Sequence, residues 1–185
     1  MQDTYKIIIS GEGGQGVLSI AKIMAYAAWE QGRKSTFVPY FSTEKRGGIA
    51  TAMAQIGDED IPFPKFRHAD LWVALSQRAV DRIHPFLKDG SVVIVNSHLV
   101  KDLSSIEKWN PHVIDATKLA KEELKKPRTF NMIIMGAMLN YVPGVTPEGF
   151  EAALEKTFHD KYERDPELKE LNHRAFVMGH DLISK

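Results

Sequence analysis

The residues best suited to chemistry form two glycine-rich segments in the first third of the sequence. The first, GEGGQGV, supplies Gly11, Gly13, Gly14, Gln15, Gly16 and Val17, and the second, STEKRGG, supplies Ser42, Thr43, Glu44, Arg46, Gly47 and Gly48. Because glycines have no side chains, the backbone N–H groups of such turns can approach a ligand closely. The guanidinium of Arg46 can bind a phosphate or carboxylate through two parallel hydrogen bonds. These segments predict a site for an anionic or polar ligand.

The first segment matches G-x-G-x-x-G through Gly11, Gly13 and Gly16, and it lies between a strand-like and a helix-like stretch. A dinucleotide site of this kind normally has an acidic residue about twenty residues further on. That residue belongs at the end of the second strand, where the nearest carboxylate, Glu44, follows closer to thirty residues after the loop, so a self-contained NAD(P)- or FAD-binding oxidoreductase is kept only as an alternative. Tight packing without a ligand at the first segment, and a plain surface turn at the second, also remain open.

The elements that must position these segments alternate between strands and helices. The pattern predicts strands over Tyr5–Ser10, Thr36–Phe41 and Leu71–Leu75, with Pro39 placing the second strand near an edge. It predicts helices from Val17 to about Gly32 and through Val80, Ile83 and Leu87, the latter stopped by Gly90. Further strands are expected in IATAMAQI, SVVIVNS and PHVIDAT. This order indicates an α/β fold, a Rossmann-like three-layer sandwich with a mostly parallel sheet, in which both glycine segments line one crevice.

The last third of the sequence is predicted to be helical. TFNMIIMGAMLNYV is apolar nearly all round, which indicates a helix that is deeply buried or shared with another chain. Thr146 with Pro147, and Asp165 with Pro166, mark two helix starts. We interpret residues 1–185 as a single domain whose C-terminal helical extension covers about 146–185. On the last helix we expect a narrow packing seam made of Leu168, Leu171, Ala175, Met178 and Leu182.

Composition excludes several classes of function. Lys plus Arg and Asp plus Glu both number 24, so no basic surface predicts nucleic-acid or anionic membrane partners. The absence of cysteine excludes a thiol nucleophile and an iron–sulfur cluster held by this chain's own thiolates. The seven histidines form no metal-binding motif, and no catalytic residue is predicted. Without a signal peptide or an apolar run of spanning length, we expect a cytoplasmic protein.

Taken together, GEGGQGV, TEKRGG and FNMIIMGAML resemble the gamma subunits of the 2-oxoacid:ferredoxin oxidoreductases over roughly residues 5 to 160. Asn131 and Gly136 match the family in the third of these segments. The sequence departs from the family at Ser42–Thr43, where members often carry a tyrosine or serine followed by Gly-Pro. This departure leaves the branch of the family, and with it the particular 2-oxoacid, undetermined.

The resemblance implies a subunit that works within a larger complex and covers its active site on the coenzyme A side. The complex is expected to contain alpha, beta and ferredoxin-like delta subunits, and to use thiamine diphosphate, Mg²⁺, iron–sulfur clusters and coenzyme A. It would oxidatively decarboxylate a 2-oxoacid to an acyl-coenzyme A, while this chain alone would bind none of those cofactors. The isolated chain is expected to be able to form a homodimer. A purely structural interaction subunit is the remaining alternative.

Overall fold

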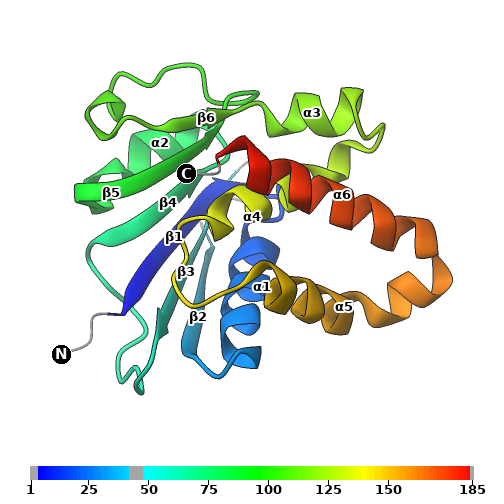
Figure 1. The fold of residues 1–185 in the computed structure, drawn as a ribbon. Helices are drawn as coiled ribbons and strands as arrows, with labels where there is room; N and C mark the ends of the chain where they lie inside the picture. Colours follow the sequence, from blue (N-terminus) through cyan, green and yellow to red (C-terminus); the bar gives the residue numbers. More distant parts are fainter. Residues whose placement is uncertain (1–3, 42–47, 184–185) are drawn as a thin grey trace.

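The structure, a computed structural model, describes residues 4–41 and 48–183, and its strands form one twisted sheet (Figure 1). Within the described residues the strand order is β2-β3-β1-β4-β5-β6. The strands are β1 Tyr5–Glu12, β2 Lys34–Phe41, β3 Ile49–Gly57, β4 Ala69–Ala74, β5 Leu87–Asn96 and β6 His112–Ile114. The predicted α/β fold with a mostly parallel sheet is therefore confirmed.

The centre of the sheet is apolar on both faces. Ile7, Ile8 and Ile9 in β1 have no exposed surface, as expected for a strand covered from both sides. β1, β4, β5 and β6 pair in parallel. β3 lies antiparallel between β1 and β2, so that β2 forms an edge of the sheet, where Pro39 removes no hydrogen bond that a central strand would need.

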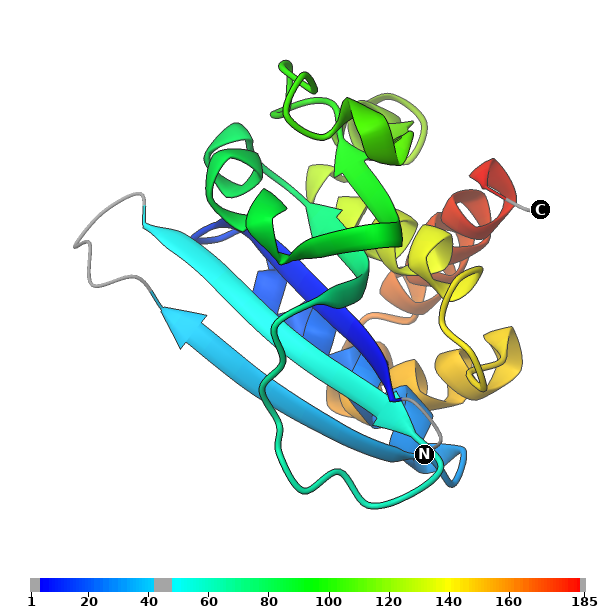
Figure 2. The ribbon, with the colours of Figure 1, turned by 90° about the vertical axis from the view of Figure 1, so that its left-hand side faces the viewer.

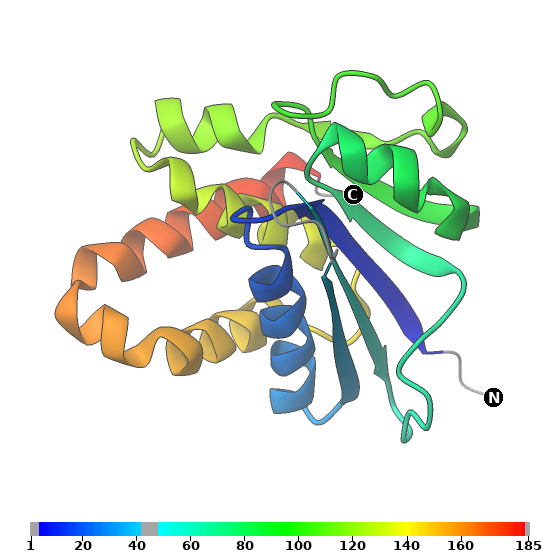
Figure 3. The ribbon, with the colours of Figure 1, turned by 180° about the vertical axis from the view of Figure 1, so that it is seen from behind.

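Helices cover the two faces unequally. α1 Val17–Glu30 and α4 Phe130–Leu139 pack on one face, and α2 Gln77–Ile83 packs on the other. α3 Ala116–Glu122 follows β6 (Figures 1 and 3). The short 3₁₀ helices are His84–Phe86, Glu107–Trp109 and Pro127–Thr129. Figure 2 shows that the face of β3 and β2 that points away from α1 carries no helix in the described part of the chain.

The two predicted C-terminal helices are α5 Pro147–Arg164 and α6 Pro166–Leu182. Their predicted caps are present, because Thr146 Oγ1 accepts from Gly149 N at 3.1 Å and Asp165 Oδ1 accepts from Leu168 N at 3.2 Å. Figure 3 shows α5 and α6 extending outward beyond α1 and α4. Their inner ends nevertheless join the main core, through Phe150, Ala153, Leu154, Ala175 and Phe176.

α4 is buried almost all round, as its composition predicts, and α6 lies directly against it. A Cβ atom on Gly136 would lie 2.0 Å from Phe176 O, and one on Gly179 would lie 1.8 Å from Ile133 O. The two helices therefore approach so closely that only glycine fits at these positions.

Two details of the sequence prediction need correction. The predicted seam on the last helix is confirmed only in part: Ala175 is buried and Leu171 and Met178 pack against the main core, whereas Leu182 is 50% exposed. The buried residues Asn172, Phe176 and Gly179 lie outside the predicted seam, because the close contact with α4 runs through Phe176 and Gly179. The helix predicted to run through Leu87 ends at Ile83, and Leu87 begins β5, in which Gly90 (φ 81°) lies within a register shift.

In the described part of the chain, no helix combines the length and the apolar character needed to cross a membrane.

Candidate functional site

The first glycine segment forms a tight turn between β1 and α1, at the carboxyl edge of the parallel strands. β1 ends at Glu12 and α1 begins at Val17, while Leu75 N donates to Ser10 O at 2.9 Å just beyond the end of β4. Gly14 and Gly16 have φ angles of 90° and 77°. These left-handed conformations explain why glycine is required at both positions.

Two glycines of the motif make close packing contacts inside the molecule. A Cβ on Gly11 would lie 2.4 Å from Gln15 Oε1, and one on Gly16 would lie 2.2 Å from Asn131 Nδ2. The Gln15 side chain folds back over Gly11, with its oxygen accepting from Glu12 N at 2.6 Å. Val17 is buried in the core. Gly11, Gln15, Gly16 and Val17 thus shape the turn, and their predicted contact with a ligand stays a prediction.

Gly13 and Gly14 are the exposed part of this turn. Both are solvent-exposed, and a Cβ built on either would meet no atom within 4 Å. Within the described residues, no acceptor pairs with their N–H groups, and α1 has no side-chain cap at Gly16. The start of this 14-residue helix therefore combines unpaired N–H groups with the positive end of the helix dipole. Such a turn can bind an anion without any charged side chain.

Most of the second glycine segment, namely Ser42, Thr43, Glu44, Arg46 and Gly47, lies outside the described residues, and its predicted role stays a prediction. The flanks of the segment are placed. β2 ends at Phe41, which pairs with Ala50, and Ala50 pairs in turn with Gly11. Gly48 precedes Ile49, which pairs with Glu12. Both flanks therefore lie beside the first glycine segment, at the same edge of the sheet.

Two buried oxygens near this turn have no hydrogen-bond partner among the described residues. They are Asn131 Oδ1, on the first turn of α4, and Ser76 Oγ, directly after β4. Ser76 is only 2% exposed and was not predicted as a site residue. A polar residue at the end of a buried strand, as in WVALS, is the sequence signal that would have identified it. A buried oxygen without a hydrogen-bond donor costs folding free energy, and both of these oxygens lie near the glycine turn.

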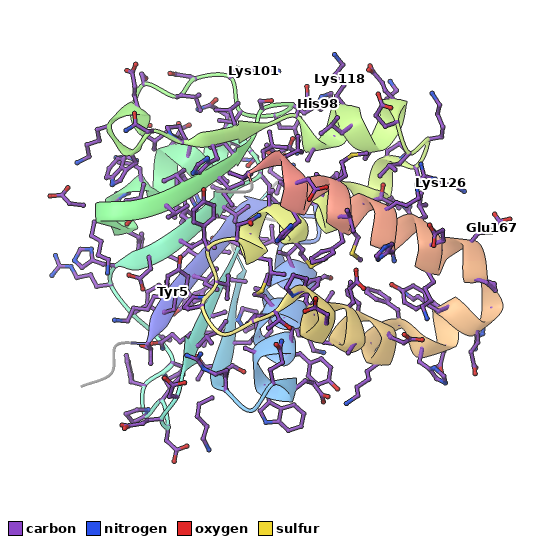
Figure 4. All side chains as sticks on the ribbon, in the orientation of Figure 1. Tyr5, His98, Lys101, Lys118, Lys126 and Glu167 are labelled. Atoms are coloured by element: carbon purple, nitrogen blue, oxygen red, sulfur yellow. The ribbon has the colours of Figure 1, made fainter. Side chains whose placement is uncertain are left out.

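Basic side chains also follow the carboxyl ends of β5 and β6, where Figure 4 labels His98, Lys101 and Lys118. Each of the three contacts a group of its own chain: His98 Nδ1 lies 3.5 Å from Asp115 Oδ1, Lys101 Nζ donates to Ser97 O at 2.7 Å, and Lys118 Nζ lies 4.0 Å from Glu122 Oε2. These basic side chains therefore have partners within the chain, whereas the N–H groups of Gly13 and Gly14 have none among the described residues.

Two tyrosines with raised pKa values lie at the opposite edge of the sheet. Burial, together with the charge of Asp70, raises the pKa of Tyr5 at the start of β1. Burial also raises the pKa of Tyr141, whose hydroxyl lies 2.8 Å from His112 Nε2. His159, Asp160 and Glu163 form a fully exposed group on α5 whose ligand atoms lie close enough for a metal ion. None of these groups adjoins the glycine turn, which offers N–H donors rather than an acid or a base.

Comparison with known proteins explains this architecture. The chain matches the pyruvate ferredoxin/flavodoxin oxidoreductase family over residues 6–182. It is 32% identical to the 2-oxoglutarate synthase subunit KorC of Methanocaldococcus jannaschii, covering 97% of this chain and 94% of that protein. It is 34% identical to the pyruvate/ketoisovalerate oxidoreductases common subunit gamma of Thermococcus kodakarensis, over 83% of this chain and 86% of the relative.

A solved structure gives the same result. The gamma subunit of a keto/oxoacid ferredoxin oxidoreductase from Geobacter sulfurreducens superimposes with a TM-score of 0.81 at 29% identity, covering 96% of this chain and 97% of that one. The resemblance to gamma subunits inferred from the glycine segments is confirmed. The chain belongs to the pyruvate ferredoxin/flavodoxin oxidoreductase family.

Proposed function

We propose that the chain is the gamma subunit of a thiamine diphosphate-dependent 2-oxoacid:ferredoxin oxidoreductase complex. The complex would decarboxylate a 2-oxoacid oxidatively, transfer the acyl group to coenzyme A and pass the electrons to ferredoxin. The observation that carries this proposal is the family match over residues 6–182, which includes the glycine turn and the buried helix α4. Relatives named as gamma subunits have nearly the length of this chain, which supports the same division into subunits.

The chemistry of the cofactors is assigned to the other subunits. An iron–sulfur cluster needs thiolate ligands, and the chain has no cysteine, so its residues do not fit a cluster. The clusters would belong to a ferredoxin-like delta subunit, and thiamine diphosphate with Mg²⁺ to the alpha and beta subunits. This chain would then contribute binding and orientation, and it would be inactive alone.

The exposed glycine turn is proposed to bind a phosphate of coenzyme A. Gly13 and Gly14 present backbone N–H groups at the start of α1, where a negative charge is favoured. Arg46 is proposed to bind a second anionic group from the neighbouring loop, since the flanks of that loop meet the glycine turn. Phosphates held in this way would orient the thiol end of coenzyme A toward the acyl group formed by the other subunits.

The proposed substrate is a member of the 2-oxoacid class. The two relatives of nearly equal identity are named for 2-oxoglutarate in one case and for pyruvate and ketoisovalerate in the other. A panel of 2-oxoacids, assayed with the whole complex purified from its host, identifies the substrate directly.

Gly13→Ala tests the role of the glycine turn in that complex. The Cβ has open space and the backbone is not left-handed, so the variant should fold and assemble normally. The added methyl group should displace a phosphate from the amides and raise the KM for coenzyme A about tenfold, the loss expected for one charge-assisted hydrogen bond. Gly14→Ala adds backbone strain, for which Gly90→Ala is a matched control, since Gly90 has a similar φ and open space far from the turn.

Other outcomes would favour the alternatives. If Gly13→Ala and Arg46→Ala both leave the KM for coenzyme A unchanged in an intact complex, the chain has a purely structural role. Flavin absorbance or saturable NAD(P)H binding by the isolated chain would instead support a self-contained oxidoreductase.

A further inference from the structure

We propose that the segment 61–68, called here the Phe63 segment, docks the chain onto another subunit that offers an apolar pocket bordered by carboxylates. The segment connects the end of β3 to the start of β4, at the edge of the sheet opposite the glycine turn. Figure 2 shows it running as a long loop along the helix-free face of the sheet. This inference rests on the proposed function, because it requires a partner subunit.

The backbone of the Phe63 segment is held in place from inside. Gln55 in β3 is 3% exposed, and its Nε2 donates to Phe63 O at 2.8 Å, while its Oε1 accepts from Thr4 Oγ1 at 3.1 Å. Pro62 and Pro64 fix their own φ angles on both sides of Phe63. Phe66 packs against the core cluster beneath this face. The conformation around Phe63 is therefore set before any partner binds.

Phe63 itself is exposed to solvent. The residue is 66% exposed, although its backbone oxygen is anchored by a buried glutamine. A single exposed apolar residue is common on protein surfaces. An exposed aromatic ring on a preordered backbone is different, since little conformational entropy is lost when it enters a pocket. Aromatic residues in such positions often dominate the affinity of an interface.

The charges around Phe63 define the partner's chemistry. Two of the three acidic residues that precede the segment are paired within the chain: Asp58 Oδ1 lies 2.8 Å from Arg33 Nε, and Asp60 Oδ1 lies 3.0 Å from Lys34 Nζ. The third, Glu59, is exposed, so the two cations of the segment outnumber the one remaining carboxylate. Lys65 and Arg67 have no ion pair among the described residues. Lys65 Nζ lies 5.4 Å from the centre of the Tyr40 ring, which keeps it close to the sheet. A positive rim beside an aromatic side chain is complementary to an apolar pocket flanked by carboxylates.

A second copy of this chain fits that description poorly. The hollow of about 330 Å³ between α5 and α6 is lined by three glutamates, two of which are already engaged. Glu155 Oε1 accepts from Lys169 Nζ, and Glu151 Oε1 lies beside His173 Nδ1, each at 2.6 Å. The occupant inferred here is therefore a different subunit.

The test measures the dissociation constant of the chain for a complex assembled from the other subunits alone. Phe63→Ser should weaken binding about thirtyfold, as expected for a central aromatic contact, and Phe63→Leu should recover part of the loss. Lys65→Gln with Arg67→Gln should weaken binding about fivefold and flatten its dependence on salt. The matched control, Lys121→Gln with Arg128→Gln, removes two exposed cations far from the segment and should leave binding unchanged.

Circular dichroism of each isolated variant verifies folding, and the charge variants keep the test valid even if Phe63→Ser is poorly folded. Wild-type affinity in Phe63→Ser and in the Lys65/Arg67 variant would overturn the inference while the proposed function stands. Failure of the wild-type chain to bind any other subunit would overturn both. Loss of a homodimer, seen by sedimentation in Phe63→Ser with unchanged binding to the other subunits, would show that the occupant is a second copy and would contradict the inference.

Discussion

Gln15 Nε2 donates a hydrogen bond of 3.2 Å to Leu75 O. The oxygen of the same amide accepts from Glu12 N, so one side chain joins the end of β1 to the residue that follows β4. This connection crosses the carboxyl edge of the sheet directly beneath the exposed glycines. Gln15 therefore holds the backbone of the glycine turn in place, and its predicted contact with a ligand stays a prediction.

Gln15→Ala should lower the free energy of unfolding by about 1–2 kcal/mol, because two backbone groups lose their partner in a partly buried site. Since the turn would loosen, the KM for coenzyme A in the assembled complex should rise as well. Urea unfolding of the isolated chain and steady-state kinetics of the complex measure the two effects.

Gln77→Ala is the matched control for that experiment. The Gln77 amide also bonds backbone groups, accepting from Lys101 N and Asp102 N and donating to Asp102 O, but in an exposed loop. The control should cost stability without changing the KM. If Gln15→Ala lowers stability and leaves the KM unaltered, the side chain serves folding only.

Gly136→Ala should destabilise the chain by about 3 kcal/mol or more, because the new Cβ would lie 2.0 Å from a backbone oxygen of α6. The backbones of two packed helices cannot move apart locally to relieve this clash, whereas a side chain can change its conformation. In the control, Gly149→Ala, the Cβ meets the side-chain amide of Gln31. That amide can move away at the expense of its bond to Thr146 N, so the loss should stay near 1 kcal/mol. Equal losses in thermal unfolding would contradict the glycine contact.

Local signals in the sequence were sufficient for most of the fold. The isoleucine run of β1, the periodicity of α1 and the caps at Thr146 and Asp165 depend on neighbours in the chain. The burial of Phe176 and Gly179 on α6 depends instead on close contact with α4 at Gly136, which no periodicity along α6 encodes. Leu87 fits a helical pattern equally well, and only its pairing with Ala69 places it in a strand.

In the candidate site, too, the sequence predicts what depends on neighbouring residues and not what depends on distant ones. The glycine spacing was enough to place the turn between a strand and a helix, but not to separate its packing residues from its exposed ones. That distinction appears only when Gln15 folds over Gly11 and Asn131 lies against Gly16. The position of Ser76 after a buried strand is visible in the sequence, but its burial is created by residues distant in sequence. The predicted contribution of residues 42–47 stays a prediction.

Tyr5→Phe should make the free energy of unfolding less dependent on pH above pH 10. Figure 4 labels Tyr5 on β1, where burial raises the pKa of its hydroxyl above the ordinary value of 10.0. A raised pKa in the folded state means that stability is complete below pH 10 and is lost at higher pH, since only the unfolded chain ionises there. Above pH 10, the free energy of unfolding of the wild type should fall by up to about 1 kcal/mol per pH unit more than that of the variant.

Urea unfolding at pH 8 and at pH 10.5 measures this difference, and the two proteins should have similar stability at pH 8. Tyr141→Phe serves as a comparison, since burial raises the pKa of that hydroxyl too. Identical alkaline losses in the wild type and Tyr5→Phe would rule out the raised pKa of Tyr5.

Lys156 on α5 contacts Glu30 on α1, and Lys156→Met should make the stability of the chain less dependent on acidic pH. Hydrogen bonds from Lys156 and then Tyr26 hold the pKa of Glu30 below its ordinary value of 4.5. A lowered pKa in the folded state means that the contribution is present above pH 4.5 and is lost as the pH falls through the folded value. The wild type should therefore be more stable than the variant at pH 7, and this advantage should shrink toward pH 3 and in high salt. Lys22→Met, which removes an exposed cation of α1 with no ion pair in the described residues, should show neither trend. An advantage that stays constant across this pH range would mean that Lys156 stabilises the contact through its packing rather than its charge.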